Sequence, residues 1–361
     1  MGVFGHPEFD HHESVHYFHD AHTGLKAVVA IHSTALGPAV GGCRRWQYAS
    51  DADALTDALR LSRGMTYKNA VAGLPFGGGK AVMLANALTP KTTDLFYAFG
   101  RAVDSLNGRY FTAEDIGVGV GDMRRVQRET DFVYGLPKSG DRAGGDPSPW
   151  TALGVFLGIK AAADIQLGRD SIEGLKIAVQ GVGHVGLSLC RLLHNAGAIL
   201  FVADVNKSKL ELAHGELPLN EVSPAELLYS DVDVLAPCAL GSILDSDTIP
   251  RIKAKIIAGA ANNQLASDAD GARLAERQIL YAPDYVVNAG GIVNVAHEHV
   301  GNSTEDKVRA DISRIPERLK TIFAEAEATA RPTNLIADDM ARRIVSAGPP
   351  DTELTPARKT A

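Results

Sequence analysis

Two lysines in the first third of the chain stand in settings that suggest chemistry. Lys80 follows three glycines in "LPFGGGKAVM", and Lys68 lies in the otherwise uncharged stretch "GMTYKNA". A glycine-rich loop with a lysine can bind phosphate, but that motif needs Ser or Thr directly after the lysine and a helix that begins there. Ala81 follows Lys80, and the residues around it predict a strand that a glycine loop enters. The sequence therefore excludes a phosphate loop of the nucleotide-hydrolase type.

A more specific motif lies in "KIAVQGVGHVGLSLCRLLHNAG", where a G-x-G-x-x-G pattern separates a predicted strand from a predicted helix. In dinucleotide-binding folds such glycines allow a tight turn, close approach of the backbone to a pyrophosphate, and close packing of the helix on the strand. The helix N-terminus then offers N–H groups to the phosphates. The candidate cofactor-binding residues of this turn are Gly181, Val182, Gly183, His184, Val185 and Gly186.

Asp204 ends the next predicted strand, in "AILFVADV". A carboxylate at this place accepts hydrogen bonds from the adenosine ribose of a bound dinucleotide and would repel a 2′-phosphate. The sequence therefore predicts NAD rather than NADP as cofactor. The alternative is a carboxylate that is merely solvated at the end of a strand.

A hydride-accepting cofactor gives the two lysines a joint purpose on an amino-acid substrate. One ammonium group would hold the α-carboxylate, and the other would act as an acid–base group near neutral pH. Asp115, in "FTAEDIG", would then transfer protons at the substrate amine. The alternative for both lysines is a side chain that lies along the surface without a chemical role.

The composition limits the classes of protein to which the chain can belong. The chain has 361 residues, enough for two domains, with 45% hydrophobic and 22% charged residues. Its net charge of −7, with acidic and basic residues mixed, gives no electrostatic footprint for nucleic acid. We find no apolar run long enough for a membrane span and no signal peptide, and Cys43, Cys190 and Cys238 are too scattered for a disulfide framework. We expect a cytoplasmic protein.

Histidines gather in the N-terminal stretch, but they do not have the ligand spacing of a zinc site. We expect a polar surface beside a strand hairpin and no metal. The histidines concerned are His6, His11, His12, His16, His19 and His22.

The elements that must position these residues follow from periodicity. Residues 25–32 and 80–85 read as strands, and "SDADALTDALRLSRGMTYKNAVAG" reads as a helix that Ser50 or Asp51 caps, with Lys68 near its end. Another helix is predicted over 91–107, before a short strand at "RYFTAED". The glycine- and proline-rich residues 135–151 predict a hinge or domain junction.

Beyond that junction, strand and helix patterns alternate, as is typical of parallel βαβ units. We therefore predict an α/β protein with an N-terminal α/β domain, followed by a Rossmann-type, doubly wound dinucleotide-binding domain. The predicted boundaries are 1–138 for the first domain, 139–330 for the second, and 331–361 for a C-terminal helix and tail.

Six segments together resemble the glutamate/leucine/phenylalanine/valine dehydrogenase family, most closely its leucine dehydrogenase branch. They are "GPAVGGCRRWQY", "LSRGMTYKNAVAGLPFGGGKAV", "GRYFTAEDIG", "APCALGSIL", "IIAGAANNQL" and "APDYVVNAGGIVNV". The resemblance implies oxidative deamination of an L-amino acid to a 2-oxo acid with ammonia and NADH as products. It also implies that the N-terminal α/β domain is a substrate-binding and oligomerisation domain and that the protein is a homo-oligomer. A cleft between the two domains that opens and closes is implied as well, with C-terminal helices that return to the first domain.

Residue roles carried over from the family concern the two domains separately. In the first, the resemblance implies that Lys68 binds the substrate carboxylate and that Lys80 and Asp115 are catalytic. Gly41 and Gly42 would lie against the substrate with Met65 beside them. In the second, it implies cofactor or substrate contacts for Thr151, Cys238, Ala239 and Asn262.

The preferred amino acid is argued from the side-chain pocket. Glutamate-acting relatives carry a lysine just before the Gly-Gly pair, where this chain has Val40. A carboxylate buried against valine would cost several kcal/mol, so glutamate is disfavoured. The pocket that the resemblance implies is aliphatic and suits leucine, isoleucine or valine; its residues are Val40, Ala113, Ile292 and Val295. A phenylalanine- or tryptophan-type substrate remains the alternative.

Two other classes are open. A 2-hydroxy-acid dehydrogenase would need a His/Arg pair on its substrate and would leave Lys68, Lys80 and Asp115 without purpose. A non-catalytic NAD-binding sensor would not need all three of these residues.

Overall fold

The protein is described by a computed structural model that covers residues 2–86, 90–136, 143–239, 241–301 and 303–349. The chain forms two compact units. The first contains the described residues up to Asp146, those of Val295–Glu305 and those from Ala341 onward; the second contains Pro147–Asn294 and Asp306–Met340. Of the predicted junction at 135–151, residues 137–142 lie outside the described part, and the change of unit falls between Asp146 and Pro147.

The first unit is built on a five-stranded mixed sheet of order β1-β2-β4-β3-β5. β3 runs parallel to both of its neighbours, whereas β2 is antiparallel to β1 and β4. The elements are η1 (Val3–Gly5), β1 (Ser14–Asp20), β2 (Leu25–Ser33), β3 (Ala39–Trp46), α1 (Asp51–Val71), β4 (Gly77–Leu84), α2 (Thr93–Asp104), β5 (Tyr110–Glu114) and α3 (Val120–Val126).

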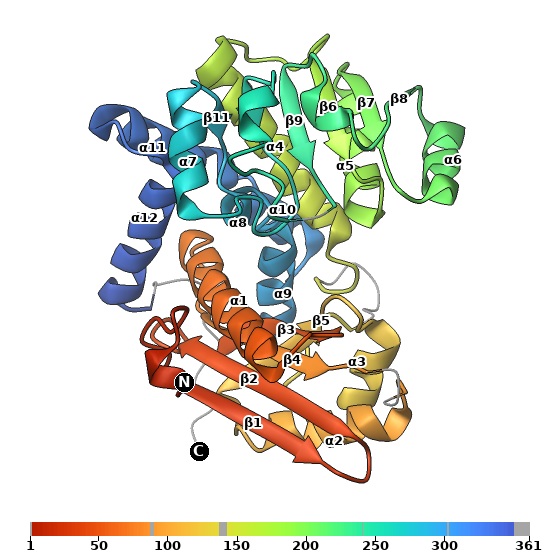
Figure 1. Ribbon diagram of the computed structural model, residues 1–361, viewed down its shortest axis with the longest axis vertical. Helices are drawn as coiled ribbons and strands as arrows, with labels where there is room; N and C mark the ends of the chain where they lie inside the picture. Colours follow the sequence, from red (N-terminus) through yellow and green to blue (C-terminus); the bar gives the residue numbers. More distant parts are fainter. Residues whose placement is uncertain (1, 87–89, 137–142, 240, 302, 350–361) are drawn as a thin grey trace. The chain divides into compact units, whose positions relative to one another are not determined.

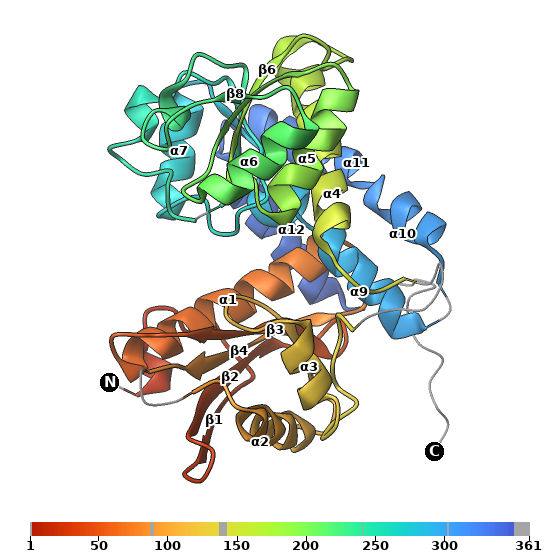
Figure 2. The same ribbon diagram turned by 90° about the vertical axis from the view of Figure 1, so that its right-hand side faces the viewer.

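Helices cover both faces of this sheet. Figure 2 shows α1 on one side and α2 and α3 on the other. Ser50 caps α1 as predicted, since its Oγ accepts a hydrogen bond from Asp53 N at 3.2 Å. Ala58 and Leu59 of α1 pack against Ala30 and Val82 of the sheet. Alternate residues of a strand share a face, so Lys80 emerges from β4 on the face that α1 covers.

The three glycines before Lys80 are part of β4, so the prediction of a loop at this place was wrong. Their Cβ positions are occupied by the protein's own atoms. A Cβ on Gly78 would lie 2.1 Å from Thr66 N of α1, and one on Gly77 would lie 1.9 Å from Ser33 O. A Cβ on Gly79 would lie 2.7 Å from the ring of Tyr110. Glycine is therefore required by internal packing, not by the approach of a ligand.

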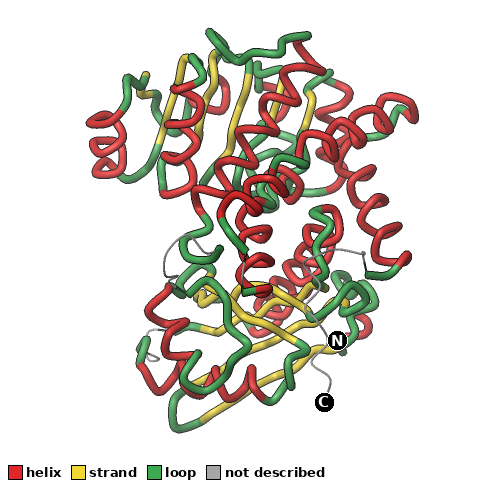
Figure 3. The backbone as a smooth tube through the Cα atoms, turned by 180° about the vertical axis from the view of Figure 1, so that it is seen from behind, coloured by secondary structure: helices red, strands yellow, loops and turns green. Residues whose placement is uncertain are grey.

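The second unit is a parallel six-stranded sheet of order β11-β10-β9-β6-β7-β8, with helices packed on it (Figures 1 and 3). Successive strands are added outward from β6 on one side and from β9 on the other, which is the doubly wound order that was predicted. The elements are α4 (Ser148–Leu167), β6 (Lys176–Gln180), α5 (His184–Asn195), β7 (Ile199–Ala203), α6 (Lys207–Glu216), β8 (Asn220–Glu221), η2 (Leu227–Tyr229), β9 (Val234–Pro237), η3 (Ile249–Arg251), β10 (Ile256–Ile257), α7 (Asp268–Glu276), β11 (Leu280–Tyr281) and α8 (Asp284–Val287).

The last helices belong to both units. They are α9 (Gly290–Val300), α10 (Glu305–Ile312), α11 (Ile315–Thr329) and α12 (Thr333–Ala347). The division between units falls inside α9 and again inside α12. Within the first unit, Arg342 near the end of the chain donates a hydrogen bond from Nε to the Tyr67 hydroxyl at 3.0 Å. Residues 350–361 of the predicted C-terminal tail lie outside the described part.

The α/β fold class predicted from the sequence is confirmed. Among the described residues, no helix combines the length and apolarity that crossing a membrane requires. Cys43, Cys190 and Cys238 are free thiols.

Candidate active site

The two residues predicted to be catalytic are in direct contact in the first unit. Lys80 Nζ, on β4, lies 2.5 Å from Asp115 Oδ2, just after β5. The Lys80 side chain is 7% exposed and that of Asp115 is 20% exposed. Two ionised groups this deeply placed are favourable only when they are paired. The sheet brings together residues that are 35 positions apart in the chain.

A second cation, which the sequence analysis did not single out, contacts the same carboxylate oxygen. Arg44 Nε, on β3, donates to Asp115 Oδ2 at 3.1 Å. Burial by itself would raise the pKa of Asp115, but Lys80 and Arg44 outweigh it and hold that pKa well below its usual range. Asp115 is therefore a carboxylate at neutral pH in the protein without substrate.

The Gly41-Gly42 pair packs beside this carboxylate. A Cβ on Gly42 would lie 2.9 Å from Asp115 Cβ, and one on Gly41 would lie 3.2 Å from Met65 Cγ of α1. Met65 and Lys68 are three residues apart in α1 and therefore share one side of the helix. The structure thus brings Gly41, Gly42 and Met65 together with Lys80 and Asp115, and Lys68 follows one turn later with a partly exposed side chain.

The residues predicted to line the side-chain pocket are distributed over both units. Val40 is 1% exposed and is paired with Phe111 of β5, and Ala113 is paired with Gly42. Val295 is 7% exposed and belongs to the first unit; Ile292, partly exposed on the same helix α9, belongs to the second.

Four aromatic rings of the first unit pack against one another, and this packing was not predicted from the sequence. Tyr134 stacks on Phe111 with ring centroids 4.9 Å apart, and the Tyr134 hydroxyl and His299 Nδ1 share a hydrogen bond. Phe76 packs edge-on against His299 at 5.3 Å. These four rings join β5 to the end of α9. No local pattern predicts such contacts, because Tyr134 and His299 are 165 positions apart.

The glycine turn of the second unit lies where the strand order reverses, between β6 and β9. In doubly wound sheets, ligands bind at this switch point. Gly181 has a φ of +92°, which disfavours other residues. A Cβ on Gly186 would lie 1.9 Å from Gly181 O. A Cβ on Gly183 would meet only Lys209 Nζ, at 3.8 Å, so the turn leaves room there for a phosphate group.

Other candidate cofactor residues surround this turn. Ala239 and Cys238 directly follow β9, and a Cβ on Gly181 would lie 2.7 Å from Ala239 Cβ. Val182 N donates to Asp204 Oδ2 at 2.9 Å, so this carboxylate also fixes the glycine turn. The fit to a dinucleotide rests on this open, glycine-lined turn at the start of α5.

Asn262 and Thr151, also in the second unit, are held by neighbouring groups. Asn288 Nδ2 donates to Asn262 Oδ1 at 2.7 Å. Thr151 Oγ1 donates to Pro147 O at 3.1 Å within α4, and a Cβ on Gly291 would lie 2.7 Å from that hydroxyl oxygen. Both side chains are thus fixed in orientation, which suits residues that position a ligand.

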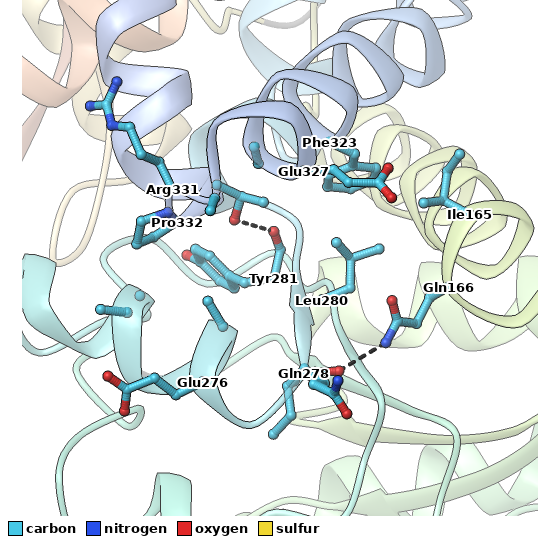
Figure 4. Close-up of a pocket in the computed structure, with 17 residues that line it drawn as sticks. Ile165, Gln166, Glu276, Gln278, Leu280, Tyr281, Phe323, Glu327, Arg331 and Pro332 are labelled. Atoms are coloured by element: carbon cyan, nitrogen blue, oxygen red, sulfur yellow. Dashed lines mark hydrogen bonds between the residues drawn. The ribbon is translucent and has the colours of Figure 1, made fainter.

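The second unit also contains a cavity of about 660 Å³ that includes none of the predicted site residues. It lies between α4, α7, β11 and α11 and is lined by apolar groups such as Leu280 and Phe323. Figure 4 shows Gln166 at its edge, donating to Gln278 O, whereas Arg331 extends away from it. The cavity lacks a converging set of titratable groups.

The histidine-rich N-terminus is only in part the polar surface that was expected. His12 is 6% exposed, and its Nε2 lies 3.0 Å from both Leu59 O and Ser62 Oγ of α1. Within the described part of the chain, no group of three or more His, Cys, Asp or Glu side chains is arranged to hold a metal ion.

Comparisons with known proteins agree on one family. A sequence model described as "Glu/Leu/Phe/Val dehydrogenase, dimerisation domain" matches residues 12–132, and one described as "Glutamate/Leucine/Phenylalanine/Valine dehydrogenase" matches residues 201–341.

Similar proteins differ in their named substrates. The chain is 48% identical to a leucine dehydrogenase of Geobacillus stearothermophilus over 346 residues, which are 96% of this chain and 94% of the relative. It is 48% identical to an L-tryptophan dehydrogenase of Nostoc punctiforme over 334 residues, 92% of each chain. It is 46% identical to a valine dehydrogenase of Streptomyces virginiae over 339 residues, 93% of this chain and 94% of the relative. A solved structure of L-tryptophan dehydrogenase from Nostoc punctiforme has a TM-score of 0.80 at 46% identity and covers 93% of this chain and 96% of that one.

Proposed function

Because the chain belongs to the Glu/Leu/Phe/Val dehydrogenase family, we propose that it catalyses the reversible, NAD-dependent oxidative deamination of a branched-chain L-amino acid. The substrate is leucine, isoleucine or valine, and the products are the 2-oxo acid, ammonia and NADH. The observation that carries the proposal is the buried contact between Lys80 Nζ and Asp115 Oδ2 at 2.5 Å, beside the backbone of the Gly41-Gly42 pair.

The residues of the first unit divide the work on the substrate. Lys68 binds the α-carboxylate through a charge-assisted hydrogen bond. Gly41 and Gly42 present backbone groups, and Met65 packs beside them. NAD, when bound, would supply the acceptor for the hydride of Cα. After the substrate ammonium has lost a proton, loss of that hydride would leave a carbon–nitrogen double bond on the substrate. Lys80 in its neutral amine form, its proton having passed to Asp115, takes a proton from the water that adds to that carbon. Asp115 then gives a proton to the nitrogen, and ammonia leaves as the added hydroxyl loses its proton and becomes the carbonyl of the 2-oxo acid.

The second unit holds the cofactor. The turn Gly181–Gly186 and the start of α5 bind the pyrophosphate, while Asp204 accepts hydrogen bonds from the adenosine ribose. Ala239 and Cys238 line the turn, and Thr151 and Asn262 orient the nicotinamide end. A carboxylate at position 204 supports NAD over NADP because it repels a 2′-phosphate.

Val40 is the residue on which the substrate preference depends. It is buried and carries no charge to meet a second carboxylate, which argues against glutamate. Ala113, Ile292 and Val295 are aliphatic as well, and we propose them as further contacts of the substrate side chain. The alternative is an aromatic, phenylalanine- or tryptophan-type substrate, and the similarity to an L-tryptophan dehydrogenase at 48% identity favours it. The N-terminal match to a dimerisation domain supports a homo-oligomer.

Substitution of Val40 by glycine tests the substrate assignment. Removing its three side-chain carbons costs contacts with a branched aliphatic chain and makes room for a ring. A contact of this size is worth roughly 1–3 kcal/mol in kcat/KM. The ratio of kcat/KM for 4-methyl-2-oxopentanoate to that for phenylpyruvate should exceed about ten in the wild type and fall about tenfold in Val40→Gly. A wild-type preference for phenylpyruvate would replace the aliphatic assignment by the aromatic one.

A further inference from the structure

Arg44 links the proposed catalytic carboxylate to the helix that covers the sheet. Its side chain is 17% exposed, and its guanidinium contacts two carboxylates. Nε donates to Asp115 Oδ2 at 3.1 Å, and Nη1 donates to Asp57 Oδ2 at 3.0 Å. Asp57 lies on α1, so one arginine on β3 connects three parts of the first unit.

We propose that Arg44 is a positioning residue for the reaction: its guanidinium holds the Asp115 carboxylate beside Lys80, and Asp57 holds Arg44 in turn. The inference rests on the proposed function of Lys80 and Asp115. It adds to that function a residue that touches the proton-transferring carboxylate without being expected to touch the substrate.

The geometry explains why a second cation is needed. Lys80 Nζ is a compact charge on a flexible stem, and a carboxylate paired with it alone can turn about its bonds. The guanidinium of Arg44 is planar and donates from fixed directions. Because Nε and Nζ converge on the same oxygen, Oδ2, the orientation of the Asp115 carboxylate is fixed.

The far side of Arg44 is fixed as well. Asp57 accepts from Arg44 Nη1 with both carboxylate oxygens, at 3.0 and 3.3 Å, and from the Tyr48 hydroxyl at 2.5 Å. Burial and the hydrogen bond to Asp57 raise the pKa of Tyr48, so this phenol stays a neutral donor. Tyr48, Arg44 and Lys80 thus donate hydrogen bonds, and Asp57 and Asp115 between them accept. The positive charge of Arg44 and the negative charge of Asp57 each have an opposite charge in contact.

The charged and titratable groups around Asp115 come from several elements. Lys80 on β4 and Arg44 on β3 lower its pKa. Asp57 on α1 is the other carboxylate in the network. Cys43 and Tyr110 lie near enough to interact with Asp115, but burial raises the pKa of both, so they remain neutral. Removal of Arg44 therefore leaves Lys80 as the one cation in contact with this carboxylate among the described residues.

Arg44→Gln is the direct test, with leucine and NAD as substrates. We expect kcat to fall about tenfold or more, because a group that orients a general acid–base residue is lost, while KM for leucine and for NAD changes less than about threefold. The acidic limb of the pH profile of kcat/KM should move to higher pH, since Asp115 loses a neighbouring positive charge.

Two further variants separate charge from geometry. Arg44→Lys keeps the charge but cannot bridge two carboxylates, so kcat should fall while the acidic limb stays in place. If Arg44→Gln fails to fold, Arg44→Lys takes its place as the test of the inference. Asp57→Asn should lower kcat without moving the acidic limb upward, because the charge that it removes is negative. Arg109→Gln is the matched control, since Arg109 lies just before β5, is 49% exposed and pairs with Glu13 at 3.1 Å. The kcat and pH profile of this variant should equal those of the wild type.

The inference is overturned if folded Arg44→Gln, or Arg44→Lys in its place, retains kcat within about threefold of the wild type. It is also overturned if kcat falls while KM for NAD rises equally and the pH profile of Arg44→Gln superposes on that of the wild type. Either result requires an active wild type. A wild type that deaminates none of the amino acids would instead refute the proposed function itself.

Discussion

Asp115 is a largely buried carboxylate held between two cations, and this arrangement decides what the first unit can do. Catalytic roles for Asp115 and Lys80 were inferred from the resemblance of "GGGKAV" and "FTAEDIG" to family segments, and the structure places the two groups 2.5 Å apart. Arg44 lies in another of the family segments, "GPAVGGCRRWQY", and was given no role, because no local pattern indicates a contact over 71 positions. The alternation of side chains along β3 did offer one indication. It places Arg44 on the same face of the sheet as Gly42, which was predicted to lie against the substrate.

Asp204 shows a second limit of reasoning from sequence at this scale. Its place at the end of β7 was predictable, but its bonds were not: Oδ2 accepts from Val182 N and Oδ1 accepts from Asn206 N at 2.8 Å. Asn206 in turn caps α6 by accepting from Ser208 N and Lys209 N. An arginine that is to bind the 2′-phosphate of NADP should therefore not replace Asn206, because the cap of α6 would be lost. Val205 is the better position, since its side chain is 90% exposed.

A change of cofactor preference is accordingly predicted for Asp204→Ser combined with Val205→Arg. The like charge that opposes a 2′-phosphate is removed, and a guanidinium that can pair with it is added. The ratio of kcat/KM for NADP to that for NAD should rise by about tenfold or more, with Asp204→Ser alone as the control for loss of the turn's hydrogen bond. A wild type that uses NADP as well as NAD would contradict the role of Asp204.

At the scale of elements, β4 and α1 approach each other closely, with Thr66 of the helix against Gly78 of the strand. The sequence predicted both elements and the cap of the helix, but it assigned the three glycines to a loop. Glycine runs are more often loops than strands. Here the close approach of α1 to β4 overrides that tendency, since Thr66 N occupies the place of a Gly78 side chain at 2.1 Å.

Two glycine-to-alanine substitutions test this packing. Gly78→Ala should lower the free energy of unfolding by about 1–3 kcal/mol, because the added methyl group forces α1 away from β4. Gly64→Ala, within α1, is the matched control: a Cβ there meets nothing within 4 Å. It should raise the free energy of unfolding by about 0.5–1 kcal/mol, since alanine is the better helix former. Urea denaturation of both variants measures these effects. If the two substitutions changed the free energy of unfolding equally, backbone propensity and not the packing of α1 on β4 would explain why glycine stands at position 78.

His32, on β2, makes the packing of α1 sensitive to acid. It lies under α1 with Nδ1 2.8 Å from Thr66 Oγ1, and burial lowers its pKa from 6.5 to about 4 despite Asp10 at 3.6 Å. Above pH 6.5 the imidazole is neutral in both the folded and the unfolded chain, so His32 does not lower the free energy of unfolding there. As the pH falls from about 6.5 to about 4, the unfolded chain binds the proton first, so stability is lost by up to about 1.4 kcal/mol per pH unit.

The prediction for this element is that His32→Gln loses less stability on acidification than the wild type. We expect the difference between the free energies of unfolding at pH 7.5 and pH 5 to be smaller by about 1–2 kcal/mol in the variant. Urea titrations at both pH values provide the measurement. Parallel losses in the two proteins would mean that other groups control the acid sensitivity.

At the scale of the whole molecule, the alternation of strands and helices after residue 147 was sufficient to predict the parallel sheet, its doubly wound order and the glycine turn at its switch point. The helices α9 and α12 were harder to assign, because each contributes to both compact units. Strand pairing, rather than any motif, decides which residues of the first unit meet, and the β1-β2-β4-β3-β5 order is not written in local periodicity.

Substrate preference is likewise a property of the assembled molecule. Relatives at 46–48% identity act, by their names, on leucine, valine or tryptophan, so overall similarity does not select among them. The residues proposed to contact the substrate side chain, Val40, Ala113, Ile292 and Val295, come from three separate stretches of the chain. A few side-chain volumes in such a pocket change specificity by one to two orders of magnitude without altering the fold.

Consumption of NADH in the presence of 4-methyl-2-oxopentanoate, with and without ammonium, tests the central claim most directly. The wild type should oxidise NADH when both the 2-oxo acid and ammonium are present and should not do so when either is omitted. Lys80→Ala, assayed beside it, should lose kcat by roughly 10²–10⁴-fold or more while its affinity for NADH stays nearly unchanged, because Lys80 lies in the first unit and the glycine turn in the second. NADH oxidation that does not require ammonium, or a Lys80→Ala variant with more than about a tenth of the wild-type kcat, would contradict this account.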